Sequence, residues 1–321
     1  MSEPLILGID VGGTKLAGVA LLEQGIAAED RRELDATPLE NQVARMAEDL
    51  VAAAGRPAAA IGIAVPGQVD VRSGVIELAV NLAASGLPIG ALVTAELGVP
   101  CFVEHDARAV AAWLAHRPGS PADLAYLSVG TGISAGVVLG GELLRGGDGL
   151  AGEVGHLMAD PNGPRCACGL TGCLEAIASG PAVARAAAAE LAIGDGSMLP
   201  QPPTTDAVYR AAAAGDAIAC RVVGRAAMHL AAAVRGLALS YGVPRVVIGG
   251  GVTRAGAAFS GPLRSALDRE RSASPLAQRA MPDEMLEILA ADRPLGALGA
   301  ADVARRSFGA PALGVGEVGQ G

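Results

Sequence analysis

The chain has 321 residues, which is enough for one large or two medium α/β domains, and we expect two. Its 24 Lys and Arg against 33 Asp and Glu give a net charge of −9, which argues against a nucleic-acid-binding surface and leaves any anionic substrate to local dipoles. The most apolar long stretch, residues 218–241, is expected to be a buried helix and not a membrane span, because charged or imidazole side chains interrupt it at Arg221, Arg225, His229 and Arg235.

Cysteine usage and the N-terminus indicate a cytoplasmic protein. The five cysteines form no even framework, so Cys101 and Cys220 are expected to be buried free thiols in a reducing compartment. The first ten residues, MSEPLILGID, carry an acid and a proline where a signal peptide needs basic charge followed by an apolar run.

The first predicted elements are two strands joined by a glycine turn. Residues 5–9 form a short apolar run that ends at Asp10, and residues 15–22 read as a second strand. The turn between them, Val11-Gly12-Gly13-Thr14, lets main-chain N–H groups approach a phosphate, and Thr14 and Lys15 add donors. An ordinary hairpin turn would give the same letters.

A well-marked helix and a buried strand follow. Thr37-Pro38-Leu39-Glu40 combines an N-cap, a proline at the first helical position and a capping-box glutamate, and an apolar face then runs to Gly55. Residues 60–65 form the strand, and Pro66-Gly67 turns the chain where open α/β sheets place ligand loops. Asn81 begins a loop that reaches Pro88, a helix is expected over residues 89–97, and a strand over residues 100–104.

That strand leads directly into His105-Asp106, and residues 107–115 are predicted to be helical. Asp106 can be the N-cap of this helix, and a carboxylate at such a junction can also accept a substrate proton. The two roles are compatible. His105 can belong to the core, to a ligand site or to the surface.

The segment 117–121, Arg-Pro-Gly-Ser-Pro, is the predicted domain boundary. A strand over residues 124–129, the turn Gly130-Thr131-Gly132 and a strand over residues 133–139 then repeat the arrangement of the N-terminus. Two related domains that hold a polyphosphate would show this weak symmetry, and so would a β-meander with tight turns.

Residues 149–175, GLAGEVGHLMADPNGPRCACGLTGCLE, are too rich in glycine and proline for a long helix or strand. The spacing H-x9-C-x-C-x4-C, from His156 through Cys166 and Cys168 to Cys173, offers the four tetrahedral ligands that Zn²⁺ takes. We favour a metal site over a chance cluster of small hydrophobic side chains.

The remainder is predicted to be mostly helical, with helices over residues 181–191, 205–214 and 218–241. A strand over residues 245–248 runs into Gly249, Gly250 and Gly251, where bare backbone can accommodate a flat base or ribose, although a tight turn has the same letters. A strand over residues 285–290, a helix over residues 295–306 and a frayed tail complete the chain.

Taken together, these motifs resemble the ROK family (repressors, uncharacterised frames and sugar kinases) from Gly8 to about Ala301. The resemblance rests on D-V-G-G-T-K at 10–15, P-G at 66–67, H-D-A-R-A at 105–109, G-T-G-I at 130–133, G-E-V-G-H at 152–156, C-A-C-G-L-T-G-C-L-E at 166–175 and I-G-G-G-V at 248–252. It implies an actin-like, hexokinase-like (ribonuclease H-like) fold of two α/β domains around a cleft. By this analogy residues 1–117 and 295–310 form the smaller domain, residues 118–294 form the larger domain with the zinc loop, and residues 311–321 are a tail.

The resemblance also implies roles for individual residues. ATP phosphates and Mg²⁺ would be held by Asp10, Gly12, Gly13, Thr14, Lys15, Gly130, Thr131 and Gly132, and adenosine by Gly249, Gly250 and Gly251. The hexose would be held by Gly67, Asn81, His105, Asp106, Glu153, His156 and Glu175, with Asp106 as catalytic base. His156 would be shared with a structural zinc bound by Cys166, Cys168 and Cys173. His105 departs from the Asn-Asp that the family usually has, which affects sugar preference.

The expected activity is therefore phosphorylation of a hexose at its 6-hydroxyl. Glucose ranks first, because E-V-G-H resembles the family's glucokinases; mannose, N-acetylglucosamine, N-acetylmannosamine and fructose stay open, as does polyphosphate as the donor. A sugar-sensing regulator of the same family would carry a helix-turn-helix domain ahead of the first turn, where only nine residues precede Asp10. A non-catalytic sugar-binding protein is a third possibility. The family commonly forms dimers or tetramers.

Overall fold

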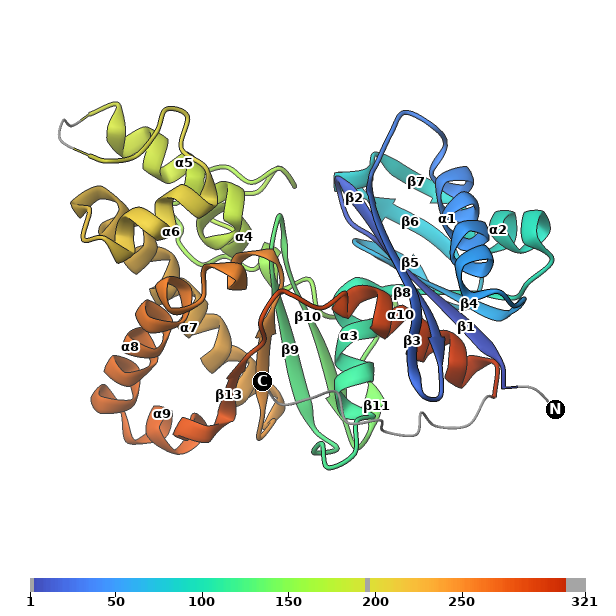
Figure 1. Cartoon of the computed structure of the whole chain (residues 1–321). Helices are drawn as coiled ribbons and strands as arrows, with labels where there is room; N and C mark the ends of the chain where they lie inside the picture. Colours follow the sequence, from blue (N-terminus) through green and yellow to red (C-terminus); the bar gives the residue numbers. More distant parts are fainter. Residues whose placement is uncertain (1–2, 194–196, 310–321) are drawn as a thin grey trace. The chain divides into compact units, whose positions relative to one another are not determined.

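The computed structural model describes residues 3–193 and 197–309. Contacts divide these residues into two compact units (Figure 1). Unit 1 contains the described parts of Met1–Ala122, Gly136–Gly152 and Pro294–Gly321, and unit 2 contains those of Asp123–Ala135 and Glu153–Arg293. The domain boundaries expected from the sequence remain predictions, and the predicted tail at residues 311–321 lies outside the described residues.

The main sheet of unit 1 has the order β3-β2-β1-β4-β8. β1 (Leu5–Val11), β2 (Lys15–Leu22) and β3 (Gly25–Glu33) are antiparallel neighbours, whereas β4 (Ala58–Val65) and β8 (Cys101–His105) continue the sheet in parallel. The carboxyl ends of β4 and β8 therefore lie at the same edge of the sheet, where ligand loops gather in such folds.

Helices cover both faces of this sheet (Figure 1). α1 (Leu39–Ala54) and α2 (Ile89–Leu97) bury the face that presents Leu5, Leu7 and Ile9. On the other face α10 (Leu295–Ser307) packs on the sheet and on α3 (Asp106–Ala115), so close that a Cβ atom at Gly8 would lie 2.0 Å from the carbonyl oxygen of Ala297. Glycine is required there because no side chain fits between strand and helix.

The start of α1 differs from the prediction. Pro38 occupies the N-cap position without a side-chain bond, so the predicted cap by Thr37 and capping box with Glu40 are wrong. The carboxamide of Gln42 instead donates to the backbone carbonyls of Thr37 and Asp35, at 2.6 and 3.2 Å. A buried amide from within the helix thus takes over the ordering of this turn.

A small antiparallel sheet also belongs to unit 1. β5 (Gln68–Asp70), β6 (Val75–Ala79) and β7 (Ala84–Leu87) form it, with the short helix η1 (Val80–Leu82) before β7. The loop predicted from Asn81 to Pro88 therefore contains a short helix and an edge strand. β6 pairs with both neighbours, so it is the central strand.

The second five-stranded sheet has the order β11-β10-β9-β12-β13. β9 (Leu124–Val129) and β12 (Val246–Gly249) run parallel, as do β12 and β13 (Leu286–Ile288), and β10 (Ile133–Leu139) forms a hairpin with β11 (Glu142–Leu143). Two five-stranded sheets with helices confirm the predicted α/β class.

Helices make up most of unit 2. They are α4 (Leu174–Ala178), α5 (Gly180–Leu191), α6 (Thr205–Ala213), α7 (Ala217–Tyr241), α8 (Ala257–Ala273) and α9 (Pro275–Ala280), with the short helices η2 (Val154–His156), η3 (Gly251–Ala255) and η4 (Asp283–Met285). Among the described residues only α7 is long and apolar enough to cross a membrane, and half of its most apolar window is buried inside the protein. It packs against other helices of the unit, as a core helix does.

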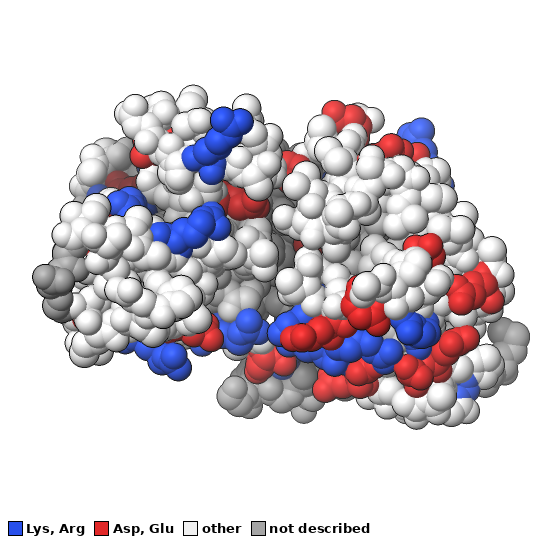
Figure 2. Space-filling model, turned by 90° about the horizontal axis from the view of Figure 1, so that it is seen from above, with Lys and Arg blue, Asp and Glu red and all other residues white. Residues whose placement is uncertain are grey.

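Charged side chains of both signs are interspersed on the face that Figure 2 draws, and the residues coloured there form no broad basic patch on it. β3 contributes an ion pair between Arg32 and Asp30, and Arg32 also reaches Asp49 of α1 at 3.0 Å. Charges on an edge strand oppose pairing with another chain.

Candidate functional site

In unit 1 the first glycine turn is tight and lies beside Asn81. The Gly12 N–H donates to the carbonyl of Lys15 at 2.8 Å, which closes the turn between β1 and β2. A Cβ atom at Gly13 would stand 3.5 Å from Asn81. Two predicted site elements, 68 residues apart in the chain, are thus brought together by the fold.

Asp10, the last residue but one of β1, lies against the first turn of α10. A Cβ atom at Gly296 would lie 2.3 Å from the Asp10 carboxylate, so glycine at this position lets the helix start touch the acid. Burial, helped by the negative charge of Asp106 and opposed by Arg31, raises the pKa of Asp10 to about 7. Two acids of the predicted site therefore share one electrostatic environment.

Asp106 is the first residue of α3, directly after β8. Its Oδ1 accepts a hydrogen bond from the Ala107 N–H at 2.5 Å and lies 3.3 Å from Nε2 of His105. The N-cap position belongs to His105, so the predicted N-cap role of Asp106 is wrong. The Asp106 side chain is 30% exposed, which leaves it accessible to a substrate, whereas the His105 side chain is 2% exposed.

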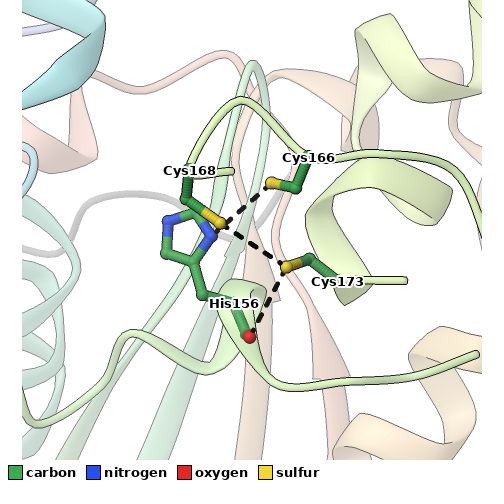
Figure 3. Close-up of side chains that lie close together, drawn as sticks. All are labelled: His156, Cys166, Cys168 and Cys173. Carbon is green, nitrogen blue, oxygen red and sulfur yellow. Dashed lines mark hydrogen bonds between the residues drawn. The ribbon is translucent and has the colours of Figure 1, made fainter. Parts of the chain in front are cut away.

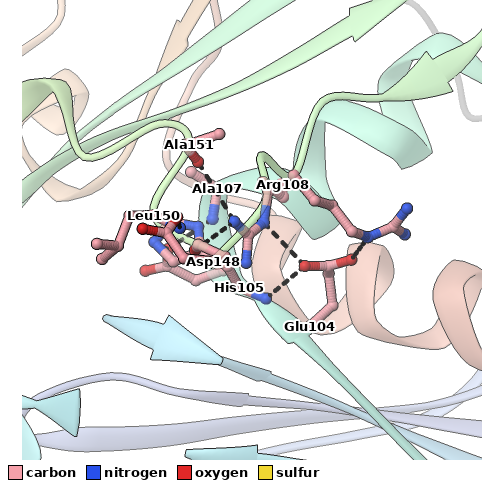
Figure 4. A network of polar contacts seen from close by, with 10 residues as sticks. Glu104, His105, Ala107, Arg108, Asp148, Leu150 and Ala151 are labelled. Atoms are coloured by element: carbon pink, nitrogen blue, oxygen red, sulfur yellow. Dashed lines mark hydrogen bonds and ion pairs between the residues drawn. The ribbon is translucent and has the colours of Figure 1, made fainter. Parts of the chain in front are cut away.

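A buried ion pair supports this junction (Figure 4). Arg108 Nε donates to Glu104 Oε1 at 2.9 Å, and both side chains are almost completely buried. Arg145 Nε reaches the second oxygen of Glu104 at 2.8 Å. Sequence reasoning missed Glu104 and Arg108, although an acid and a base spaced i, i+4 around a strand-to-helix junction could have signalled the pair.

In unit 2 the other two glycine turns lie side by side. The Gly130 N–H donates to Gly132 at 2.9 Å, and the N–H of Gly180, where α5 begins, donates to the carbonyl of Gly130 at 2.9 Å. A Cβ atom at Gly130 would lie 3.6 Å from the backbone nitrogen of Gly251. Gly250 has φ +102° and faces the carbonyl of Val129 so closely that a side chain would collide with it.

Ile133, the first residue of β10, connects this turn to the predicted sugar ligands. Its N–H donates to Oε2 of Glu175 at 2.9 Å. A Cβ atom at Gly155 would lie 2.0 Å from the carbonyl oxygen of Ile133, so the segment that carries Glu153 and His156 presses on the same residue. One backbone position thus holds both sugar-site segments of unit 2.

The predicted metal ligands converge (Figure 3). Ligand atoms of His156, Cys166, Cys168 and Cys173 all lie within 4.8 Å of one another. Nδ1 of His156 is 3.8 Å from the sulfur of Cys166, and the sulfurs of Cys168 and Cys173 are 3.7 Å apart. Tetrahedral Zn²⁺ at its usual bond lengths separates its ligands by about 3.5 to 3.8 Å, so the four residues fit zinc.

The second nitrogen of the imidazole faces the predicted sugar ligands. Nε2 of His156 lies 3.8 Å from Glu153 Oε2, while Nδ1 faces the thiols. Burial, together with hydrogen bonds with the neighbouring thiols, raises the pKa of Cys173 to about 12. A metal ion that binds here must therefore displace thiol protons, which makes its affinity depend on pH.

The fold thus groups the predicted residues within each unit. Unit 1 holds Asp10, Gly12, Gly13, Thr14, Lys15, Gly67, Asn81, His105 and Asp106, and unit 2 holds Gly130, Thr131, Gly132, Glu153, His156, Cys166, Cys168, Cys173, Glu175, Gly249, Gly250 and Gly251. Their roles toward ATP, Mg²⁺ and sugar stay predictions.

Comparison with known proteins gives consistent matches. Residues 6–307 match the sequence model of the ROK family. The glucokinase of Thermotoga maritima is 32% identical over 277 residues, covering 82% of this chain and 87% of that protein. An N-acetylmannosamine kinase of Shigella flexneri is 37% identical over 255 residues, covering 77% and 83%. The crystal structure of a ROK family glucokinase from Streptomyces griseus, in complex with glucose and AMPPNP, has a TM-score of 0.75 at 30% identity and covers 94% of this chain and 99% of that chain.

Proposed function

The chain belongs to the ROK family, and on that premise we propose that it is a sugar kinase that transfers the terminal phosphoryl group of ATP to the 6-hydroxyl of a hexose. The observation that carries the proposal is the place of Asp106. This carboxylate begins α3 at the carboxyl end of a parallel strand, is partly exposed, and lies in the electrostatic environment of Asp10, which directly precedes the first glycine turn.

Asp106 is the proposed general base. A primary alcohol is a poor nucleophile, so a carboxylate within hydrogen-bond reach accepts its proton as the oxygen attacks the γ-phosphorus in line. The bond from the γ-phosphorus to the bridging oxygen breaks, and ADP leaves. The bond from the Ala107 N–H holds Oδ1 of Asp106 in place, so the acid is oriented before the sugar arrives.

The glycine turns are proposed to bind the nucleotide. Backbone N–H groups of Gly12, Gly13 and the turn 130–132 would surround the phosphates, and bare backbone at 249–251 would accept adenosine. Lys15 and the hydroxyls of Thr14 and Thr131 would add donors. Mg²⁺ bound near Asp10 would neutralise developing phosphoryl charge, and the half-buried carboxylate of this residue offers the oxygen ligands that Mg²⁺ prefers.

Gly67, Asn81, His105, Glu153, His156 and Glu175 are proposed to hold the sugar hydroxyls. A structural zinc held by His156 and the three thiols would fix the segment from Glu153 to Glu175. With Nδ1 on the metal side, the Nε2 of His156 remains the donor toward a hydroxyl.

Glucose is the proposed substrate. The E-V-G-H pattern, the Thermotoga maritima relative named glucokinase and the Streptomyces griseus enzyme in complex with glucose support it. N-acetylmannosamine is the second candidate, because the Shigella flexneri kinase is 37% identical. N-acetylglucosamine, mannose and fructose complete the set, with polyphosphate as an alternative donor and a cytoplasmic dimer or tetramer as the expected assembly.

A coupled assay with ATP and Mg²⁺ across these five sugars tests the proposal. We expect kcat/KM for glucose to exceed that for N-acetylmannosamine by roughly tenfold or more, the scale at which one pocket contact discriminates. A higher kcat/KM for N-acetylmannosamine would make that sugar the substrate in place of glucose, and the proposed kinase activity would stand. Sugar binding without turnover of any of the five, with ATP or polyphosphate, would favour a non-catalytic or regulatory member of the family.

A further inference from the structure

Arg108 is a fully buried cation, 0% exposed, in the first turn of α3. Glu104 is its partner at 2.9 Å. Its Nη2 is equally buried and finds no hydrogen-bond partner among the residues that the structure describes. A buried guanidinium with an N–H left unsatisfied is a poor way to stabilise a fold, since apolar side chains of similar volume often do as well or better.

Arg108 instead binds the backbone of a segment 41 to 43 residues further along the chain. Its Nη1 donates to the carbonyl of Gly149 at 2.7 Å and to that of Ala151 at 3.3 Å (Figure 4). Both carbonyls belong to the irregular stretch after β11, which has no sheet or helix to fix it. Only a planar guanidinium presents donors in a fixed fork that can serve Glu104 and this segment together.

The same segment is also held from β5. The carboxamide of Gln68 donates to the carbonyl of Asp148 at 2.9 Å. A Cβ atom at Gly149, which has φ +76°, would lie 2.7 Å from the carbonyl oxygen of Val69. Residues 148–151 are therefore fixed between β5, which follows Gly67, and α3, which begins with Asp106.

We propose that Arg108 is a positioning residue, which holds Gly149–Ala151 in place so that the chain enters Gly152-Glu153 in one conformation. The inference rests on the proposed kinase function, in which Glu153 is a sugar ligand two residues beyond Ala151. Loss of the guanidinium fork loosens this entry, and the sugar then has to order it on binding. The expected signature is a higher KM for sugar with little change in kcat.

Arg108→Lys tests this role, since lysine keeps the positive charge and loses the fork. Arg145→Lys is the matched control: Arg145 binds the same Glu104 but is 40% exposed, and among the described residues it forms no hydrogen bond with the carbonyls of Gly149 and Ala151. We expect faster amide hydrogen exchange over residues 146–151 of sugar-free Arg108→Lys, a rise of about tenfold in sugar KM and a kcat within about threefold of wild type. Arg145→Lys should match wild type in all three.

Gln68→Ala keeps the proposal testable if Arg108→Lys fails to fold. Gln68 lies outside the buried Glu104–Arg108 pair, and its substitution removes the second hydrogen bond that holds the same segment. We expect faster exchange at residues 148–150 and a smaller rise in sugar KM. Unchanged exchange in the folded variants, or equal changes in Arg145→Lys, would overturn the role of Arg108. Faster exchange with an unchanged KM would overturn its link to sugar binding. A wild-type protein without kinase activity would instead refute the proposed function, and the exchange comparison would still decide whether Arg108 holds the segment.

Discussion

The backbone N–H of Ile133 donates to the Glu175 carboxylate at 2.9 Å. Glu175 lies in the first turn of α4, two residues after Cys173, and Ile133 follows directly after the turn 130–132. This bond joins the end of the metal-binding segment to a predicted phosphate turn. Oε2 makes the bond, so Oε1 is the oxygen we expect a sugar hydroxyl to meet.

Two substitutions at Glu175 separate these tasks. Glu175→Gln keeps a carbonyl oxygen for the Ile133 N–H, whereas Glu175→Ala leaves that donor without its acceptor. Because hydrogen bonds to a charged group contribute about 1.5–3 kcal/mol, both variants should lose roughly 10- to 100-fold in sugar affinity. Only Glu175→Ala should also raise the KM for ATP. Equal ATP KM values in the two variants would contradict the link.

The metal cluster predicts one bound zinc per chain. Cys166→Ser should abolish the zinc measured by elemental analysis and lower the melting temperature by more than about 5 °C, since the loop from His156 to Cys173 has almost no core of its own. Cys220→Ser is the control, because this cysteine lies outside the cluster and is exposed, so its predicted burial is wrong. Full zinc content in Cys166→Ser would refute the assignment.

Gly296 should tolerate no side chain. Gly296→Ala places a Cβ atom 2.3 Å from the Asp10 carboxylate, so it should both destabilise the protein and lower activity. Gly236→Ala in α7 adds a methyl group to open space and should stabilise by roughly 0.5–1 kcal/mol through helix propensity. Thermal melts of the two variants should therefore shift in opposite directions. A stabilised, active Gly296→Ala would contradict the close contact of Asp10 with α10.

The contact between His116, at the end of α3, and Asp302 of α10 predicts that the stability of the protein depends on pH. Burial alone would raise the pKa of Asp302, but hydrogen bonds from His116 and Arg305 outweigh it and lower the pKa below its ordinary value of 3.8. A depressed pKa contributes stability that is fully present above the ordinary pKa and is lost as pH falls through the folded-state pKa. Asp302→Asn should thus be less stable than wild type at pH 5. This difference should shrink below about pH 4 in thermal melts.

Local sequence patterns predicted much of this fold, because the residues that form a strand or a turn are neighbours in the sequence. The strand Lys15–Leu22 has its predicted bounds, since strand alternation is interrupted by glycine turns on both sides. β3 was missed because an edge strand of sequence GIAAEDRRE has no buried face to show. No element was predicted over residues 257–273, where Gly261-Pro262 suggests a turn, yet α8 runs through that proline.

Some parts of the candidate site could likewise be predicted from local sequence, and others could not. The four metal ligands lie within 17 residues of one another in the sequence, so their spacing alone predicted the cluster. The sequence around His105 did not show whether this side chain is buried, because its burial depends on how α3 packs. The Arg108 contacts with Gly149 and Ala151 span 41 and 43 residues, and no periodicity of the sequence encodes such a pairing.

The role of Asp106 is tested most directly by Asp106→Asn, which keeps the shape of the side chain and an oxygen for the Ala107 N–H but cannot take a proton. With ATP, Mg²⁺ and the preferred hexose, we predict a loss of roughly 100- to 10,000-fold in kcat, while the sugar dissociation constant from calorimetry stays within about threefold of wild type. A variant that phosphorylates the sugar at the wild-type rate would contradict the account of this protein as a kinase with Asp106 as its base.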